Sequence, residues 1–282
     1  MQQTVESLST WLRRIERWTV LTGAGVSAAS GIPTYRDTSG RWLRVDPIQH
    51  REFIESHSKR QRYWARSMVG WKGVNAALPN ANHYGLAALE RINKIDTLIT
   101  QNVDRLHQRA GSKTVIDLHG RLDRTVCLSC GGFEARESLQ KRLLSANPFV
   151  PEYSHIARPD GDADVPDDYI SQTVTPDCLS CGGTLMPDVV FFGGTVPKPR
   201  VDQCLKAIDR SAGLLVVGSS LQVYSGFRFC RYAQRRRIPI VIVNEGQTRA
   251  DDIATLKIGS HGMQRLVSAI DELIPSTEKR TA

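Results

Sequence analysis

Two closely spaced pairs of cysteines have the residue types and the spacing of a metal site. Cys127 pairs with Cys130 and Cys178 pairs with Cys181, and two glycines follow each pair. Four thiolates complete the tetrahedral shell of a Zn²⁺ ion and leave no position for water or substrate. The pattern therefore predicts one structural zinc ion, with a redox-active dithiol pair as the weaker alternative.

A glycine-rich turn is the second candidate site. Residues 23–33 read GAGVSAASGIP and offer a tight turn, small side chains and a helix N-terminus, whose free N–H groups suit a pyrophosphate. Ala28 stands where the dinucleotide fingerprint has its third glycine, and the region after Pro33 reads TYRD, which departs from the dehydrogenase plan. The segment favours phosphate binding, with a ligand-free turn as the alternative.

Polar side chains follow two further predicted strands. His119 lies between a strand and Gly120, and histidine is suited to accept a proton near neutral pH, although a lone histidine is usually structural. Gln101, Asn102 and Asp104 either bind a ribose or a carboxamide, or cap a helix that begins near residue 103. Residues 188–194 (DVVFFGG) form either a buried strand or a segment whose backbone pairs with an extended peptide.

Short apolar runs that alternate with helical segments must position these residues. The predicted strands cover residues 19–22, 97–100, 115–118, 214–217 and 240–243. This alternation predicts an α/β fold with a Rossmann-like, mainly parallel sheet covered on both faces. Ligands bind beyond the carboxyl ends of such strands, so the polar and glycine-rich strand ends are expected to meet in one crevice.

Two stretches interrupt the alternation and are interpreted as inserts in a single catalytic domain that spans residues 1–282. Residues 41–83 form a predicted helical insert. Residues 126–183 form a smaller zinc-binding module, in which residues 148–176 are expected to be irregular. The Rossmann-like part then consists of residues 1–40, 84–125 and 184–282.

The composition limits the class of protein. With 282 residues, 40% of them hydrophobic, the chain can bury a full core, and no run approaches the roughly 20 apolar residues of a membrane span. The paired cysteines indicate a reducing compartment, and we expect a cytoplasmic protein with buried thiols at Cys204 and Cys230. The net charge of +8 suits an acidic partner, but solvated surface cations explain it without nucleic acid.

The motifs taken together resemble the sirtuin family. They are, in order, residues 23–27 (GAGVS), 31–36 (GIPTYR), 100–104 (TQNVD) and 118–120 (LHG), the two cysteine pairs, and residues 217–221 (VGSSL). Residues 187–193 and 219–226 are most similar to the class II branch, which includes the mitochondrial sirtuin 4 type and bacterial relatives.

The resemblance implies an NAD-dependent protein-lysine deacylase that releases nicotinamide and O-acyl-ADP-ribose. His119 would act as the general base for a ribose hydroxyl, with Asn102 as the second catalytic residue. NAD⁺ would be the cosubstrate, and Asn102 and Asp104 would line its nicotinamide pocket. The implied cofactor-binding residues are Gly23, Ala24, Gly25, Ser27, Tyr35, Arg36, Gln101, Asn102, Asp104, Gly218, Ser219, Ser220, Asn244, Glu245, Gly246 and His261.

The resemblance also implies a protein partner. An acylated-lysine protein would bind as an extended peptide between residues 191–193 and residues 223–225. Gly194 replaces an acidic residue common in the family. The desuccinylase branch has a Tyr and an Arg in its acyl pocket, and residues 41–44 (RWLR) do not clearly offer that pair. A preference for negatively charged acyl groups is therefore disfavoured, although Arg41 and Arg44 keep it open.

Two other functions stay open at this point. One is an NAD-dependent protein mono-ADP-ribosyltransferase, which uses the same cosubstrate for a different transfer. The other is a zinc-stabilised module that senses NAD or binds nucleic acid and has weak catalysis.

Overall fold

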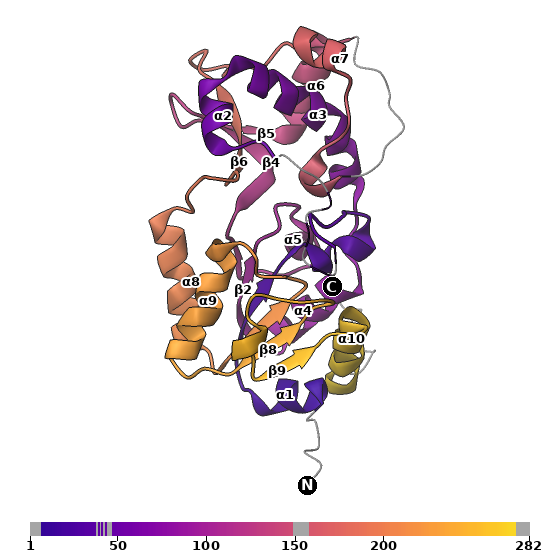
Figure 1. Ribbon diagram of the computed structural model, residues 1–282, viewed down its shortest axis with the longest axis vertical. Coiled ribbons are helices and arrows are strands. Elements are labelled where there is room, and N and C mark those ends of the chain that lie inside the picture. Colours follow the sequence, from indigo (N-terminus) through magenta and orange to yellow (C-terminus); the bar gives the residue numbers. More distant parts are fainter. Residues whose placement is uncertain are drawn as a thin grey trace.

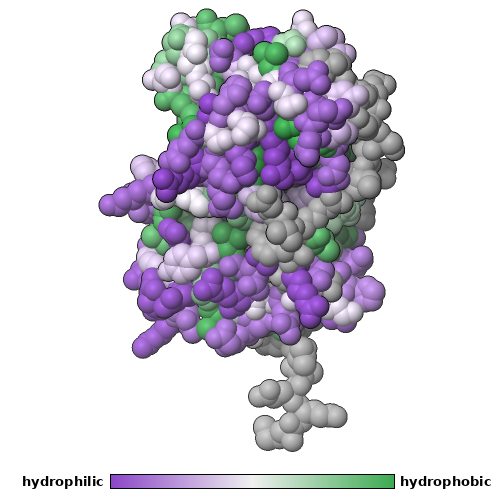
Figure 2. Space-filling model, turned by 45° about the horizontal axis from the view of Figure 1, so that its top comes forward, coloured by the Kyte–Doolittle hydropathy of each residue, from purple (hydrophilic) through white to green (hydrophobic). Residues whose placement is uncertain are grey.

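The computed structural model describes residues 7–37, 39, 41, 43, 47–148 and 158–274. These residues form a larger lobe around a parallel sheet and a smaller lobe above it (Figure 1). None of the described helices combines the length and the apolar character that a bilayer span requires. Polar residues cover most of the face drawn in Figure 2, with apolar residues in smaller patches among them.

The larger sheet has six parallel strands in the order β3-β2-β1-β7-β8-β9. Counted within this sheet, the order is 3-2-1-4-5-6, the arrangement of the dinucleotide-binding fold. The predicted α/β fold class is confirmed, and all five predicted strands are present. The strands are β1 (Trp18–Thr22), β2 (Ile95–Thr100), β3 (Val115–Asp117), β7 (Gly213–Val217), β8 (Ile240–Val243) and β9 (Leu256–Ile258).

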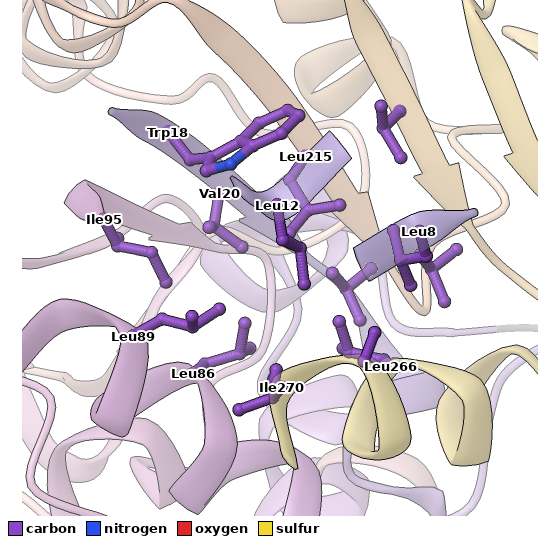
Figure 3. Packing of buried hydrophobic residues seen from close by; sticks show 14 of the residues in the cluster. Leu8, Leu12, Trp18, Val20, Leu86, Leu89, Ile95, Leu215, Leu266 and Ile270 are labelled. Carbon is purple, nitrogen blue, oxygen red and sulfur yellow. The ribbon is translucent and has the colours of Figure 1, made fainter. Parts of the chain in front are cut away.

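Helices cover both faces of this sheet (Figure 1). On one face, α1 (Leu8–Arg14), α4 (Ala81–Arg91) and α10 (Gly262–Leu273) enclose a core that includes Trp18 and Leu215 (Figure 3). On the other face, α8 (Lys198–Arg210) and α9 (Tyr224–Arg235) contribute Cys204 and Cys230 to a second core. Both thiols are buried, as predicted. The central strands β1, β7 and β8 are buried on both faces, which explains the apolar sequences of β7 (GLLVV) and β8 (IVIV).

The smaller lobe contains an antiparallel sheet in the order β5-β4-β6. Its strands are β4 (Gly120–Cys127), β5 (Phe133–Ala135) and β6 (Leu185–Val189). Around it lie α2 (His50–Glu55), α3 (His57–Ala76), α6 (Arg136–Ala146) and α7 (Asp167–Gln172). Phe53 and Trp64 share a core with Cys127, Leu139 and Leu185. The two predicted inserts therefore pack together as one lobe.

Three local predictions are corrected by the structure. The glycine-rich turn leads into short 3-10 turns, η1 (Ala24–Val26) and η2 (Ala28–Ser30), instead of an α-helix, and Gly31 ends them at a φ of 83°. The helix expected near residue 103 is α5 (Leu106–Arg109). Residues 148–176 are not wholly irregular, because they contain η3 (Pro159–Gly161) and α7, while residues 149–157 lie outside the described part.

The domain boundaries stay a prediction. The antiparallel sheet uses residues on both sides of positions 126 and 183, since β4 begins at Gly120 and β6 ends at Val189.

The last short 3-10 turn, η4 (Asp251–Ile253), precedes β9 in the larger lobe.

Candidate active site

A cavity of about 1150 Å³ lies between the two lobes. Its floor is formed by residues that follow β1, β2, β3, β7 and β8, so the carboxyl ends of these strands converge as expected. Its roof comes from α3, η3 and the segment after β6. Typical small-molecule pockets have volumes of roughly 300–1,000 Å³, so this cavity has room for a large ligand.

Glycines allow two loops to meet at the floor. Gly23 donates its N–H to the carbonyl of Val217 at 3.0 Å, and Gly25 donates to the carbonyl of Gly218 at 2.9 Å. A Cβ on Gly23 would lie 2.8 Å from the Gly218 oxygen, and a Cβ on Gly218 would lie 2.5 Å from the Val26 nitrogen. Gly218 also has a φ of 61°. This part of the floor is therefore backbone alone, which suits a ligand that must approach closely.

Most of the predicted site residues line this cavity. Ser27, Asp104, Gly246 and His261 do not; Ser27 and Asp104 lie behind its wall, and His261 is exposed at the start of α10. Those that line it are Gly23, Ala24, Gly25, Tyr35, Arg36, Gln101, Asn102, His119, Gly218, Ser219, Ser220, Asn244 and Glu245.

Hydrogen bonds fix the two amides that follow β2. The Nε2 of Gln101 donates to Ser219 Oγ at 2.8 Å and to the carbonyl of Thr22 at 3.1 Å. The Nδ2 of Asn102 donates to the carbonyl of Gly23 at 3.1 Å and to Ser27 Oγ at 3.0 Å. Asn102 is buried, so both protons of its amide are committed within the protein.

Asp104 performs one of the two functions that the sequence left open for this segment, the capping of a helix. Its Oδ1 accepts the N–H of Leu106 at the start of α5, at 2.9 Å. Its Oδ2 accepts the hydroxyl of Ser27 at 2.6 Å. Burial raises the pKa of Asp104 above its ordinary value. The carboxylate thus caps a helix and also braces the wall of the cavity.

His119 is held in one tautomer by its neighbours. Its Nδ1 lies 3.1 Å from the carbonyl oxygen of Gln101, which can only accept, so Nδ1 bears the proton in the neutral ring. Its Nε2 then has a lone pair, 2.8 Å from Ser225 Oγ. Burial lowers the pKa of His119 to about 4, and the charge of Arg200 acts in the same direction, although the Gln101 hydrogen bond opposes both. At neutral pH the ring is therefore a free base.

The roof contains a residue pair that the sequence reading missed. Tyr63 and Arg66, nearly one helical turn apart on α3, both line the cavity. Arg66 Nε donates to Asp162 Oδ1 at 2.6 Å, so its charge is compensated by the segment after η3. Residues 41–44 do not clearly offer such a Tyr–Arg pair, and Trp42 and Arg44 lie outside the described residues. The sequence signal for this pair is the segment YWAR at residues 63–66, in which the Tyr and the Arg lie three positions apart.

The segment after β6 also lines the cavity. The strand β6 ends at Val189. Beyond it, Phe192 forms a parallel bridge with Gln49, and its carbonyl oxygen accepts the N–H of His50 at 2.8 Å. Gly194 is tightly placed, because a Cβ there would lie 2.9 Å from the carbonyl of Phe191. Residues 223–225 line the same cavity, so the two segments predicted to enclose a peptide share its wall.

The four paired cysteines lie together at one edge of the smaller lobe. Their sulfur atoms all lie within 4.8 Å of one another. Cys127 Sγ is 3.5 Å from Cys181 Sγ, and Cys130 Sγ is 3.8 Å from Cys178 Sγ. A tetrahedral site with Zn–S bonds of about 2.3 Å has S–S edges of about 3.8 Å. The four thiols are therefore positioned to bind one zinc ion.

Comparisons with known proteins agree with this site. Residues 23–225 match the sequence model of the Sir2 family. A Bordetella bronchiseptica protein named NAD-dependent protein deacetylase is 49% identical over 254 residues, which is 90% of this chain and 93% of the relative. The Bos taurus protein named NAD-dependent protein lipoamidase sirtuin-4, mitochondrial, is 46% identical over 91% of this chain and 82% of its own.

Solved structures give the same result. A structure of Sir2 with a p53 peptide and NAD⁺ superposes with a TM-score of 0.73 and 31% identity, covering 93% of this chain and 95% of that one. A second, with a deacetylated p53 peptide and 3′-O-acetyl-ADP-ribose, has a TM-score of 0.74 and 30% identity and covers 94% and 96%. The chain therefore belongs to the Sir2 family, the sirtuins.

Proposed function

We propose that the protein is an NAD-dependent protein-lysine deacylase that releases nicotinamide and O-acyl-ADP-ribose. The observation that supports this most is the neutral His119 at the floor of the large cavity, whose Nε2 has no proton and can act as a base. Membership of a family whose named relatives are NAD-dependent protein deacetylases supports the same reaction.

The backbone floor at Gly23, Gly25 and Gly218 fits a dinucleotide, and a side chain on any of these glycines would collide with the facing loop and disturb this floor. Arg36 would offer charge to the phosphates, and Asn244 and Glu245 would offer polar groups to a ribose. Bound NAD⁺ supplies the ribose carbon to which the acyl oxygen becomes attached when nicotinamide leaves.

In this reaction His119 takes one proton. Its Nε2 would accept the proton of a ribose hydroxyl, and the Gln101 carbonyl would stabilise the resulting imidazolium through Nδ1. Asn102 would present its free Oδ1 to the ligand, since both protons of its amide are committed elsewhere. The smaller lobe would exclude water from the acyl group.

The protein partner would be an acylated-lysine protein that binds as an extended peptide. The walls at residues 191–193 and 223–225 support this, and so do the relatives' complexes with p53 peptides. Backbone pairing selects weakly among sequences, so many targets are expected. We also propose a cytoplasmic location, because cysteine pairs that bind zinc are typical of proteins in a reducing compartment.

The test is incubation of the protein with NAD⁺ and a panel of acyl-lysine peptides that differ only in the acyl chain. The panel includes neutral chains and chains that end in a carboxylate, because Tyr63 and Arg66 line the roof. Release of O-acyl-ADP-ribose supports deacylation. Radiolabel from NAD⁺ that stays on protein, without loss of the acyl group, supports the alternative of mono-ADP-ribosyl transfer. If neither product forms, the result would indicate an NAD-binding module.

A further inference from the structure

Two buried histidines lie behind the floor of the cavity and line none of it. His83 on α4 has no exposed surface, and His107 on α5 has 1% exposed. Their ring centroids are 4.8 Å apart. Burial lowers the pKa of His83 to about 4 and lowers that of His107 well below its ordinary value. Both rings are neutral, so each has one donor and one acceptor nitrogen.

The neighbours of His83 determine which nitrogen bears the proton. The N–H of Asn80 donates to Nδ1 of His83 at 3.2 Å, so Nδ1 is the acceptor. The Nε2–H group then points to Ser27 Oγ, at 3.5 Å. Ser27 gives its own proton to Asp104 at 2.6 Å and accepts the side-chain amide of Asn102 at 3.0 Å. His83 and the side-chain amide of Asn102 therefore both donate to Ser27 Oγ, and Ser27 passes its own proton on to Asp104.

A second chain starts at His107 and ends on the backbone of Asn102. The hydroxyl of Thr22 donates to Thr100 Oγ1 at 2.9 Å, so it has no proton left for His107. His107 Nε2, 2.9 Å from Thr22 Oγ1, must therefore be the donor. Thr100 Oγ1 also accepts the N–H of Asn102 at 3.1 Å. The backbone and the side chain of Asn102 are thus held from two directions.

We infer that His83 and His107 are positioning residues, which orient the Asn102 amide so that its Oδ1 faces the bound ligand. This inference rests on the proposed function. An apolar residue would fill the position of His107 at a lower cost, since Nδ1 of His107 is buried without a hydrogen-bond partner. A neutral imidazole donates a hydrogen bond from Nε2 to Thr22 Oγ1, which an apolar residue cannot do.

The chain offers a matched pair of variants for the His107 chain. Thr22→Val removes the hydroxyl that joins His107 to Thr100 and keeps the side-chain shape. Thr19→Val makes the same change on the same strand, where the buried Thr19 hydroxyl has no hydrogen-bond partner. We expect Thr22→Val to lower kcat about tenfold, the effect of one lost hydrogen bond, and Thr19→Val to leave kcat unchanged.

A second readout does not depend on catalysis. Hydrogen exchange of Asn102, followed by nuclear magnetic resonance in the ligand-free protein, reports how firmly this residue is held. Thr22→Val should speed exchange of its backbone N–H, and Ser27→Ala should speed exchange of its side-chain amide, by about tenfold each, while Thr19→Val changes neither. If Thr22→Val does not fold, His83→Ala, which leaves Ser27 in place, tests the His83 chain through exchange of the Asn102 side-chain amide.

The inference is overturned if the exchange rates of Asn102 stay at their wild-type values in the folded variants. It is also overturned if Thr19→Val and Thr22→Val lower kcat equally, because the loss would then be a general effect of altering β1. Failure of the proposed function looks different, since wild-type protein would then release no O-acyl-ADP-ribose. The exchange measurement would still decide whether Asn102 is held from both directions.

Discussion

The Nδ1 atom of His119 lies 3.1 Å from the backbone carbonyl oxygen of Gln101, and this contact decides the chemistry of the imidazole. A carbonyl oxygen has no proton to donate, so the ring proton stays on Nδ1 and Nε2 remains a base. The strand ends that bring these two residues together lie side by side in the sheet, at β2 and β3. The pairing of β2 with β3 therefore determines which nitrogen of His119 bears the proton.

The pH dependence of catalysis should reflect this environment. Protonation of His119 removes its lone pair, so kcat/KM falls as the pH drops through its pKa, and the midpoint should lie near 4, below the ordinary 6.5. Arg200→Gln removes a nearby positive charge that lowers this pKa and should move the midpoint to higher pH. Arg210→Gln, at the far end of α8, should not move it. A midpoint that stays near 6.5 in wild-type protein would refute this assignment.

Acid should destabilise the fold through the buried histidines. The pKa of His83 is about 4 in the folded protein and ordinarily 6.5, so the unfolded chain binds more protons between these values. The free energy of unfolding should therefore decrease as the pH falls from 6.5 to 4, by on the order of 3 kcal/mol from His83. Urea unfolding at several pH values measures this. His83→Gln should flatten the slope, and His57→Gln, at an exposed position, should leave it unchanged.

Zinc should hold the smaller lobe together. Cys130→Ser removes one of four thiolates and should lower both the zinc content and the melting temperature, because Cys127 belongs to the core of this lobe. Elemental analysis of purified protein provides the test. Cys204→Ala changes a buried thiol in the larger lobe and should keep one zinc per chain. Equal zinc content in the two variants would exclude the proposed site.

The contact between the two glycine loops should be essential for binding NAD⁺. Gly218→Ala introduces a Cβ that meets the Val26 nitrogen at 2.5 Å, at a φ of 61°, so the loop must shift and NAD⁺ affinity should fall more than tenfold. Gly31→Ala has the same kind of backbone strain, at a φ of 83°, but meets nothing within 4 Å. It should cost about 1 kcal/mol of stability and leave affinity intact. Calorimetric titration distinguishes the two effects.

Much of the larger lobe could be predicted from the sequence, because its central strands are buried on both faces and are rich in apolar residues. The strand β8 is an example, with the sequence IVIV. The strand β9 was missed because it has only three residues and the polar Lys257 at its centre. The glycine turn was recognised, but its 3-10 geometry depends on the contact with Gly218, which is almost 200 residues distant in the chain.

The site was harder to complete from the sequence than the fold. Polar residues at strand ends pointed to one crevice, and most of them line it. Tyr63 and Arg66 were missed because they lie on a helix of the other lobe, and no strand end marks their position. Ser27 is predicted to bind the cofactor, which stays a prediction, and its hydroxyl contacts Asp104 and Asn102 behind the wall. Such contacts follow from tertiary packing, which periodicity does not reveal.

Mass spectrometry of a reaction that contains the protein, NAD⁺ and an acylated-lysine peptide is the decisive test of the deacylase function. We expect deacylated peptide, nicotinamide and O-acyl-ADP-ribose in equal amounts. His119→Ala should lower their rate of formation by about 10²- to 10⁴-fold and still bind NAD⁺. The deacylase function would be refuted if the acyl group leaves as the free acid and NAD⁺ stays intact, or if His119→Ala keeps full activity.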